Sequence, residues 1–155
     1  MSIAGTASRP PEPGTLLAFD FGTRRIGVAL GNRVVRVAHP LTTIEIEAKA
    51  ERFAAIAALI DEWRPERLLV GRPVHMDGAM HEMTARADRF ARQLEGRFGV
   101  PVTQVDERGT TQAAQAMLGE AGGAGRAGRS QRDAVAAQLM LQSYFDAAIS
   151  SGSGV

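Results

Sequence analysis

Short apolar runs alternate with amphipathic stretches along this chain, a pattern that predicts both strands and helices. A continuous apolar run bounded by glycine, proline or charged residues is typical of a buried strand. Five such runs occur, at 16–19, 26–30, 34–38, 67–70 and 100–105. Between the second and third runs stands Gly31-Asn32, a hairpin signal because both residues tolerate positive φ. The first three strands are therefore predicted to form a meander.

Four further stretches carry apolar residues at three- and four-residue steps, the spacing of an amphipathic helix. Thr43 is a candidate cap for the first helix, and Pro65 ends it. Gly99 is expected to follow the last residue of the second helix, at the C′ position where glycine commonly ends a helix. We expect the helices over 44–64, 80–98, 110–118 and 130–148. The glycine-rich segment 119–129 between the last two is predicted to be a mobile loop.

The order of these elements predicts the fold class. Strand, strand, strand, helix, strand, helix, strand, helix, helix is typical of an α/β protein with a mixed five-stranded sheet flanked by helices. A chain of 155 residues is long enough for one domain with a single core. We place this domain at 15–149 and expect the tails 1–14 and 150–155 to be disordered.

Composition excludes several classes of function. With 45% hydrophobic and 23% charged residues, the chain is an ordinary globular protein. Its longest strictly apolar run, Ala54–Ile60, is too short to cross a bilayer, and no signal peptide is evident, so we expect no membrane association and a cytoplasmic protein. The absence of cysteine excludes disulfides, thiolate nucleophiles and cysteine-ligated metals.

The formal net charge is only +1, and Lys49 is the only lysine among 18 basic residues. Arginine suits phosphate because its planar fork donates two hydrogen bonds at once. A GC-rich genome also raises arginine content, so position is more informative than number. Arginines stand beside three acidic positions, as a site that grips a nucleic-acid backbone requires. These candidate nucleic-acid contacts are Arg24, Arg25, Arg108, Arg126, Arg129 and Arg132; charge-balancing surface residues are the alternative.

Three acidic residues from distant segments carry the candidate chemistry. Asp20 ends the first strand, Glu107 follows the fifth and Asp133 begins the last helix. Ligands of open α/β sheets bind beyond the carboxyl ends of the strands, so we expect these carboxylates to converge there. Oxygen ligands suit Mg²⁺ or Mn²⁺, and two such ions can activate water and stabilise the leaving oxygen in phosphodiester hydrolysis. The pattern therefore favours a metal-dependent nuclease.

Each acid also has a structural alternative. Asp20 could hydrogen-bond its own turn, Glu107 could pair with Arg108, and Asp133 could complete a capping box with Ser130. Two other functions also remain open. The segment from Asp20 resembles the phosphate loop of actin-like ATPases, although those enclose a nucleotide between two lobes, each about the size of this chain. The second alternative function is that of a noncatalytic nucleic-acid-binding module.

The ordered set of motifs resembles the YqgF family of Holliday-junction-resolvase-like nucleases linked to precursor 16S ribosomal RNA processing. The matching segments are Leu17–Leu30, His39–Leu41, Val70–Gly78, Asp106–Thr111 and Asp133–Asp146. The resemblance implies an RNase H-like fold, with Asp20, Glu107 and Asp133 as metal-binding catalytic carboxylates. It implies processing of the 5′ end of precursor 16S rRNA, with branched DNA as the alternative substrate. A monomer or weak homodimer is expected, and the role of Asp106 stays open.

Overall fold

The computed structural model describes residues 13–73, 81–106 and 126–152, without the side chains of 126, 127, 129, 130 and 148–152. Five strands and three helices lie within these ranges. In chain order they are β1 (Thr15–Asp20), β2 (Ile26–Asn32), β3 (Val37–Ile44), α2 (Lys49–Trp63), β4 (Arg67–Arg72), α3 (Glu82–Phe98), β5 (Val102–Asp106) and α5 (Arg126–Gly152). The short helix predicted at 110–118 falls outside the described residues.

The strands form one mixed sheet in the order β3-β2-β1-β4-β5. β1, β2 and β3 pair antiparallel as a meander, whereas β4 is parallel to β1 and β5 is parallel to β4. The predicted fold class, a mixed five-stranded sheet flanked by helices, is confirmed. Because β1, β4 and β5 run in one direction, their carboxyl ends lie at the same edge of the sheet. Asp20 ends β1 at that edge.

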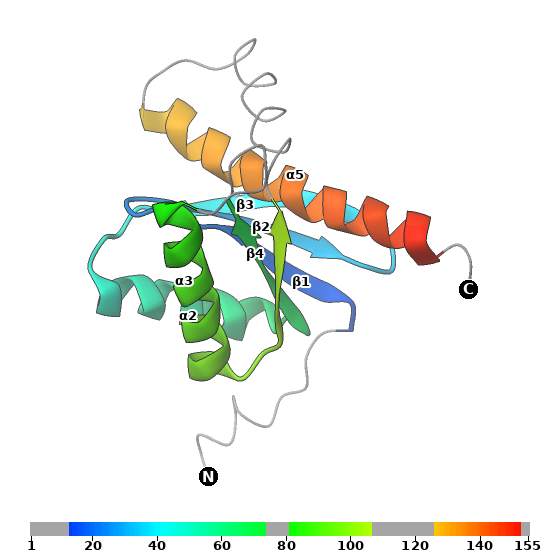
Figure 1. The fold of residues 1–155 in the computed structure, drawn as a ribbon, viewed down its shortest axis with the longest axis horizontal. Helices are drawn as coiled ribbons and strands as arrows, with labels where there is room; N and C mark the ends of the chain where they lie inside the picture. Colours follow the sequence, from blue (N-terminus) through cyan, green and yellow to red (C-terminus); the bar gives the residue numbers. More distant parts are fainter. Residues whose placement is uncertain (1–12, 74–80, 107–125, 153–155) are drawn as a thin grey trace.

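Helices cover both faces of the sheet, with α5 on one side and α2 and α3 on the other (Figure 1). Side chains alternate between the two faces along each strand. Leu17 and Phe19 of β1 belong to the core under α2 and α3. Leu16 and Ala18 belong to the core under α5. By the same alternation, Asp20 lies on the α5 face.

Small residues on β2 let α5 come close to the sheet. A Cβ at Gly27 would lie 1.9 Å from the carbonyl oxygen of Asp133, and one at Gly31 would lie 2.8 Å from the side chain of Leu141. The side-chain amide of Gln142 donates to the carbonyl of Arg36 and accepts from the amide of Ala38. α5 is thus fixed along β2 and the edge strand β3.

The hairpin between β2 and β3 differs from the prediction. Residues 33–36 form the turn, so the predicted strand at 34–38 is wrong at its start, and β3 extends to Ile44 instead. Asn32 causes the shift: its side-chain oxygen accepts from the Val34 amide, and its carbonyl accepts from the Arg36 amide. Arg36 takes a positive φ of 60°. The local turn chemistry of asparagine outweighs the strand preference of the valines.

The first helix also begins later than expected. Thr43 lies inside β3, and α2 starts at Lys49 after Ala48, so the predicted cap at Thr43 is wrong. Pairing of β3 with β2 holds this segment extended. The predicted ends are confirmed, since α2 stops before Arg64 and Pro65, and α3 stops at Gly99 in a left-handed conformation. Among the described residues, no helix is both long and apolar enough to cross a bilayer.

Candidate active site

Asp20 and Asp133 line the same cavity at the carboxyl edge of the sheet. Its volume is about 320 Å³, and the segment 21–25 completes most of its wall together with Met83. Asp20 reaches it as the last residue of β1, and Asp133 reaches it from α5. Two of the three predicted carboxylates, separated by more than 100 residues in the sequence, are thus brought to one site.

The pairing of β1 with β2 explains how these two acids meet. Asp20 stands opposite Gly27 in the antiparallel register. Gly27 in turn lies against the backbone of Asp133, so closely that no Cβ fits between them. A single glycine therefore sets Asp133 beside the end of β1. The sequence shows this glycine as part of an apolar run, but not its contact with α5.

Arg25 is paired with one of these acids. Its Nε lies 2.5 Å from Oδ2 of Asp133, and the two side chains are 33% and 22% exposed. Such a half-buried pair shows that the Asp133 carboxylate faces a cation in the cavity. The capping-box interpretation of Asp133 is wrong, because α5 begins at Arg126 rather than Ser130. Residues 126–129, predicted as loop, belong to this helix.

The turn between β1 and β2 is held by Arg52, a residue that the sequence analysis did not identify. Arg52 is only 8% exposed. It donates to the carbonyl oxygens of Thr23 and Ile46 at 2.8 Å each, and its guanidinium lies 5.7 Å from the centre of the Phe21 ring. Burial lowers the pKa of Arg52 from its ordinary value. The sequence did contain a signal for the role of Arg52, because this basic residue directly precedes Phe53 on the apolar stripe of α2.

Asp106 belongs to a different cluster from Asp20. It ends β5 opposite Arg72, whose pKa is raised first by its hydrogen bond to Asp88 and further by Asp106. Asp88 lies on α3 and accepts from Arg72 at 2.9 and 3.2 Å and from Gln104 at 2.6 Å. By strand alternation, position 106 shares the α3 face with Gln104, whereas Val105 packs in the core under α5. Asp106 thus lies beside this cluster and acts on Arg72 electrostatically.

The remaining predicted residues divide into described and undescribed ones. Arg24 is exposed and lines the cavity with Arg25, and Arg132 is half-buried next to Asp133. Arg126 and Arg129 lie in the first turns of α5, and their side chains are not described. Glu107 and Arg108 lie outside the described residues.

The donor chemistry of the cavity fits a divalent metal, but the described part of the site is incomplete. Asp20 and Asp133 offer carboxylate oxygens, the ligands that Mg²⁺ and Mn²⁺ prefer, and Asp133 already faces the Arg25 cation. Among the described residues, no group of three or more acidic, histidine or cysteine side chains could hold a metal ion. The predicted third donor is Glu107, which those residues do not include.

Fold and site together define an RNase H-like α/β protein with acidic residues at the carboxyl edge of its sheet. A solved structure described as "T. thermophilus RuvC in complex with Holliday junction substrate" has the same fold, with a TM-score of 0.53 and 20% identity. The match covers 88% of this chain and 96% of that one. The chain belongs to the RuvX (YqgF) family, whose model, described as "Holliday junction resolvase", matches residues 14–147.

Relatives that share about half of their residues with this chain are named as nucleases of precursor 16S ribosomal RNA. One from Nitrosospira multiformis, "Putative pre-16S rRNA nuclease", is 51% identical over 146 residues, which are 94% of this chain and 96% of the relative. One of the same name from Nitrosomonas europaea is 54% identical over 133 residues, or 86% of this chain and 90% of the relative. The likeness to the family expected from the motifs is confirmed.

Proposed function

We propose that this protein is a divalent-metal-dependent nuclease that processes the 5′ end of precursor 16S rRNA. The observation that carries the proposal is the cavity shared by Asp20 and Asp133 at the carboxyl edge of an RNase H-like sheet. Membership in a family whose relatives are named as nucleases supports cleavage, and the precursor 16S rRNA in the name of those relatives supports the choice of RNA.

Asp20, Glu107 and Asp133 are the proposed catalytic residues and would hold two Mg²⁺ or Mn²⁺ ions. When bound, such ions supply an activated water and neutralise charge on the leaving oxygen. Glu107 is proposed over Asp106 as the third ligand because Asp106 lies on the α3 face of the sheet with Gln104, whereas Asp20 lies on the α5 face. Asp20 and Asp133 line one cavity, which supports this cavity as the proposed site of the reacting phosphate.

Arginines next to these acids are proposed to bind the phosphates on either side of the cleaved bond. Arg24 and Arg25 line the cavity itself, and Arg132 precedes Asp133. Arg25 has a second role in this proposal: it pairs with Asp133 in the free protein and would be available to the substrate phosphate if Asp133 held a metal ion. Arg108, Arg126 and Arg129 complete the proposed set.

The first test compares Asp20→Asn with Asp61→Asn, a matched control on an exposed position of α2. With Mn²⁺ or Mg²⁺ and a precursor rRNA end, Asp20→Asn is expected to lower kcat at least about 100-fold, the scale of one catalytic group. Nucleic-acid affinity and the melting temperature should stay near wild type in both variants. Turnover of Asp20→Asn equal to that of Asp61→Asn would contradict the catalytic assignment.

A second candidate function is resolution of branched DNA. The description of the family model and the substrate named for the RuvC structure favour it. Presenting a four-way DNA junction beside the precursor rRNA end, at equal concentration and with the same metal, separates the two. A higher kcat/KM on the junction would assign the protein to DNA.

A further inference from the structure

A second cavity adjoins the one that contains Asp20 and Asp133, and Phe21 is the residue that they share. It has a volume of about 310 Å³ and is formed mainly by the first halves of α2 and α3. Phe21 lines both this cavity and the one that contains Asp20. A ligand that occupied both would therefore pass over a single aromatic ring.

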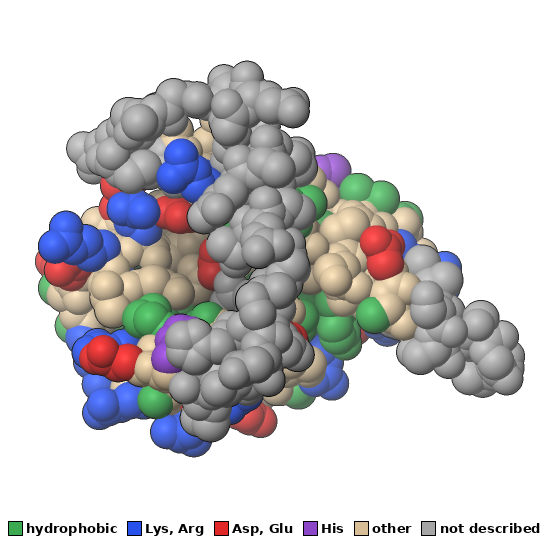
Figure 2. Space-filling view, turned by 45° about the horizontal axis from the view of Figure 1, so that its top comes forward, with side chains coloured by type: hydrophobic (Ala, Val, Ile, Leu, Met, Phe, Trp, Pro, Cys, Tyr) green, Lys and Arg blue, Asp and Glu red, His purple; other side chains and the backbone are tan. Residues whose placement is uncertain are grey.

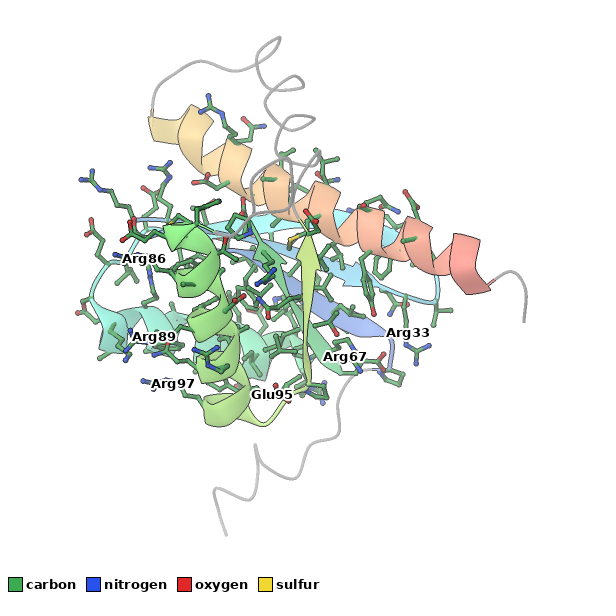
Figure 3. The ribbon with its side chains drawn as sticks, in the orientation of Figure 1. Arg33, Arg67, Arg86, Arg89, Glu95 and Arg97 are labelled. Atoms are coloured by element: carbon green, nitrogen blue, oxygen red, sulfur yellow. The ribbon has the colours of Figure 1, made fainter. Side chains whose placement is uncertain are left out.

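The lining of the second cavity is strongly basic. Four of its residues are cationic, and Glu47 is the one acidic residue among them. Lys49 and Arg89 are exposed at its rim. Figure 3 shows Arg86, Arg89 and Arg97 following one another along the side of α3 next to α2, and Figure 2 shows basic side chains gathered on that side of the molecule. Arg86 is paired with Glu82 at 2.8 Å, so the excess of positive charge in this lining comes from the other cations.

The basic lining continues along α3. A third cavity of about 540 Å³ lies next to the second one. It shares Lys49 and Phe53 with that cavity and is also lined by Arg97. Arg86, Arg89 and Arg97 fall on one face of the helix because they are separated by three and eight residues. The two cavities adjoin at Lys49 and Phe53, and together they are called the α2–α3 groove; its cationic lining residues are Lys49, Arg52, Arg86, Arg89 and Arg97.

The end of the groove nearest Asp20 is rigid and partly aromatic. The Phe21 and Phe90 rings are 4.7 Å apart between centroids, and Phe53 and Phe90 are 6.1 Å apart. Arg52, which is 8% exposed, is fixed there by two backbone carbonyls and by the Phe21 ring. A buried cation held in place favours an anion beside it, since the anion offsets the cost of removing the guanidinium from water.

We propose that the α2–α3 groove binds an unpaired nucleic-acid strand that continues from the phosphate held at the Asp20 cavity. Several cations along the groove can contact the phosphates of a sugar–phosphate backbone, and the half-exposed Phe21 ring offers a surface for a sugar or base. A base can stack on the Phe21 ring only when it is unpaired, which favours a single strand over a duplex as the occupant. This inference rests on the proposed nuclease function and adds a second binding site to it.

The test measures binding without divalent metal, so that it does not depend on cleavage. The probes are a blunt RNA hairpin and the same hairpin with a 5′ or a 3′ single-stranded extension of about eight nucleotides, within the site sizes of single-strand grooves. Wild type is expected to bind one extended probe roughly tenfold more tightly than the blunt one. In the double variant Lys49→Ala/Arg89→Ala, the ratio of Kd for the blunt probe to Kd for the extended probe should fall close to one.

Salt dependence gives a second readout. Loss of two phosphate contacts is expected to reduce the slope of log Kd against log salt by about 1.4, at 0.7 per contact on a single strand. Arg92→Ala is the matched control, because Arg92 is exposed on α3 but does not line the groove. It should keep the advantage of the extended probe and the slope. Melting temperatures of the variants verify folding.

The outcomes separate the groove from the nuclease. If the double variant keeps the extension advantage, or wild type has none, the groove proposal is overturned whatever the cleavage assay shows. If the advantage is lost only in the double variant while wild type cleaves neither RNA nor branched DNA with Mn²⁺, the groove stands as a strand-binding site and the proposed nuclease function fails.

Discussion

At the residue scale, Gly27 determines the distance between α5 and the end of β1. Its missing side chain leaves room for the Asp133 backbone, which would lie 1.9 Å from an added Cβ. Backbone cannot rotate away as a long side chain can, so any larger residue must displace the helix. Asp133 would move with it, away from the cavity that it shares with Asp20.

Gly27→Ala is therefore expected to lower the free energy of unfolding by about 1–3 kcal/mol, the usual cost of overpacking, and to reduce cleavage further than this loss of folded protein explains. Chemical denaturation and kcat, measured on the same preparation, check both effects. Gly96→Ala is the control. Gly96 lies in α3 with no atom within 4 Å of an added Cβ, so alanine should stabilise by about 0.5–1 kcal/mol. If Gly27→Ala changed neither the free energy of unfolding nor kcat, this contact would not determine the position of α5.

At the element scale, one polar cluster joins α3 to the ends of β4 and β5. Asp88 of α3 accepts two hydrogen bonds from Arg72 and one from Gln104. The pKa of Asp88 is lowered, first by the hydrogen bond from Arg72 and further by Gln104 and nearby arginines, against the opposing effect of burial. Since β4 and β5 end at the same edge of the sheet as β1, this cluster stabilises the edge at which the candidate site lies.

Asp88→Asn is expected to cost about 1–3 kcal/mol of unfolding free energy at pH 7, the scale of hydrogen bonds to a charged group. Because the pKa of Asp88 is lower when folded than the ordinary value near 3.8, its stabilisation is present above pH 4 and is lost as the pH falls through the folded value. The difference between wild type and variant should therefore shrink below pH 4. Urea unfolding from pH 3 to 7 measures this, and a constant difference would contradict the assignment.

At the scale of the whole molecule, chain segments that are far apart in sequence meet at one edge of the sheet. Asp20 comes with the meander and Asp133 with the last helix, and they line one cavity. Carboxylates brought together repel each other, and a bound cation relieves this repulsion only in the folded protein. Folding and metal binding are therefore expected to be coupled.

Mn²⁺ or Mg²⁺ at about 100 times its Kd should raise the melting temperature by about 5–10 °C, from a linkage energy of about 2.7 kcal/mol. The shift should disappear in Asp20→Asn and Asp133→Asn and remain in Asp61→Asn. Differential scanning calorimetry at constant ionic strength measures it. An equal shift in all variants would place the metal elsewhere.

Much of the fold followed from the sequence because it depends on local periodicity. Apolar runs located β1, β2, β4 and β5, and Pro65 and Gly99 located the ends of α2 and α3. The errors fell where non-local pairing or a side chain overrides propensity. Thr43 is extended because β3 pairs with β2, and Val34 is in a turn because Asn32 bonds to its amide.

The amino-acid sequence by itself determined the alternation of strands and helices and the placement of Asp20 at a strand end, since both are written in neighbouring residues, and the order of these elements indicated a mixed sheet. Tertiary structure decided the rest. The approach of Asp133 to Asp20 across Gly27, the pairing of Arg25 and the groove between α2 and α3 depend on packing between segments far apart in the chain. No local pattern encodes such contacts, because they exist only once the sheet and helices have come together.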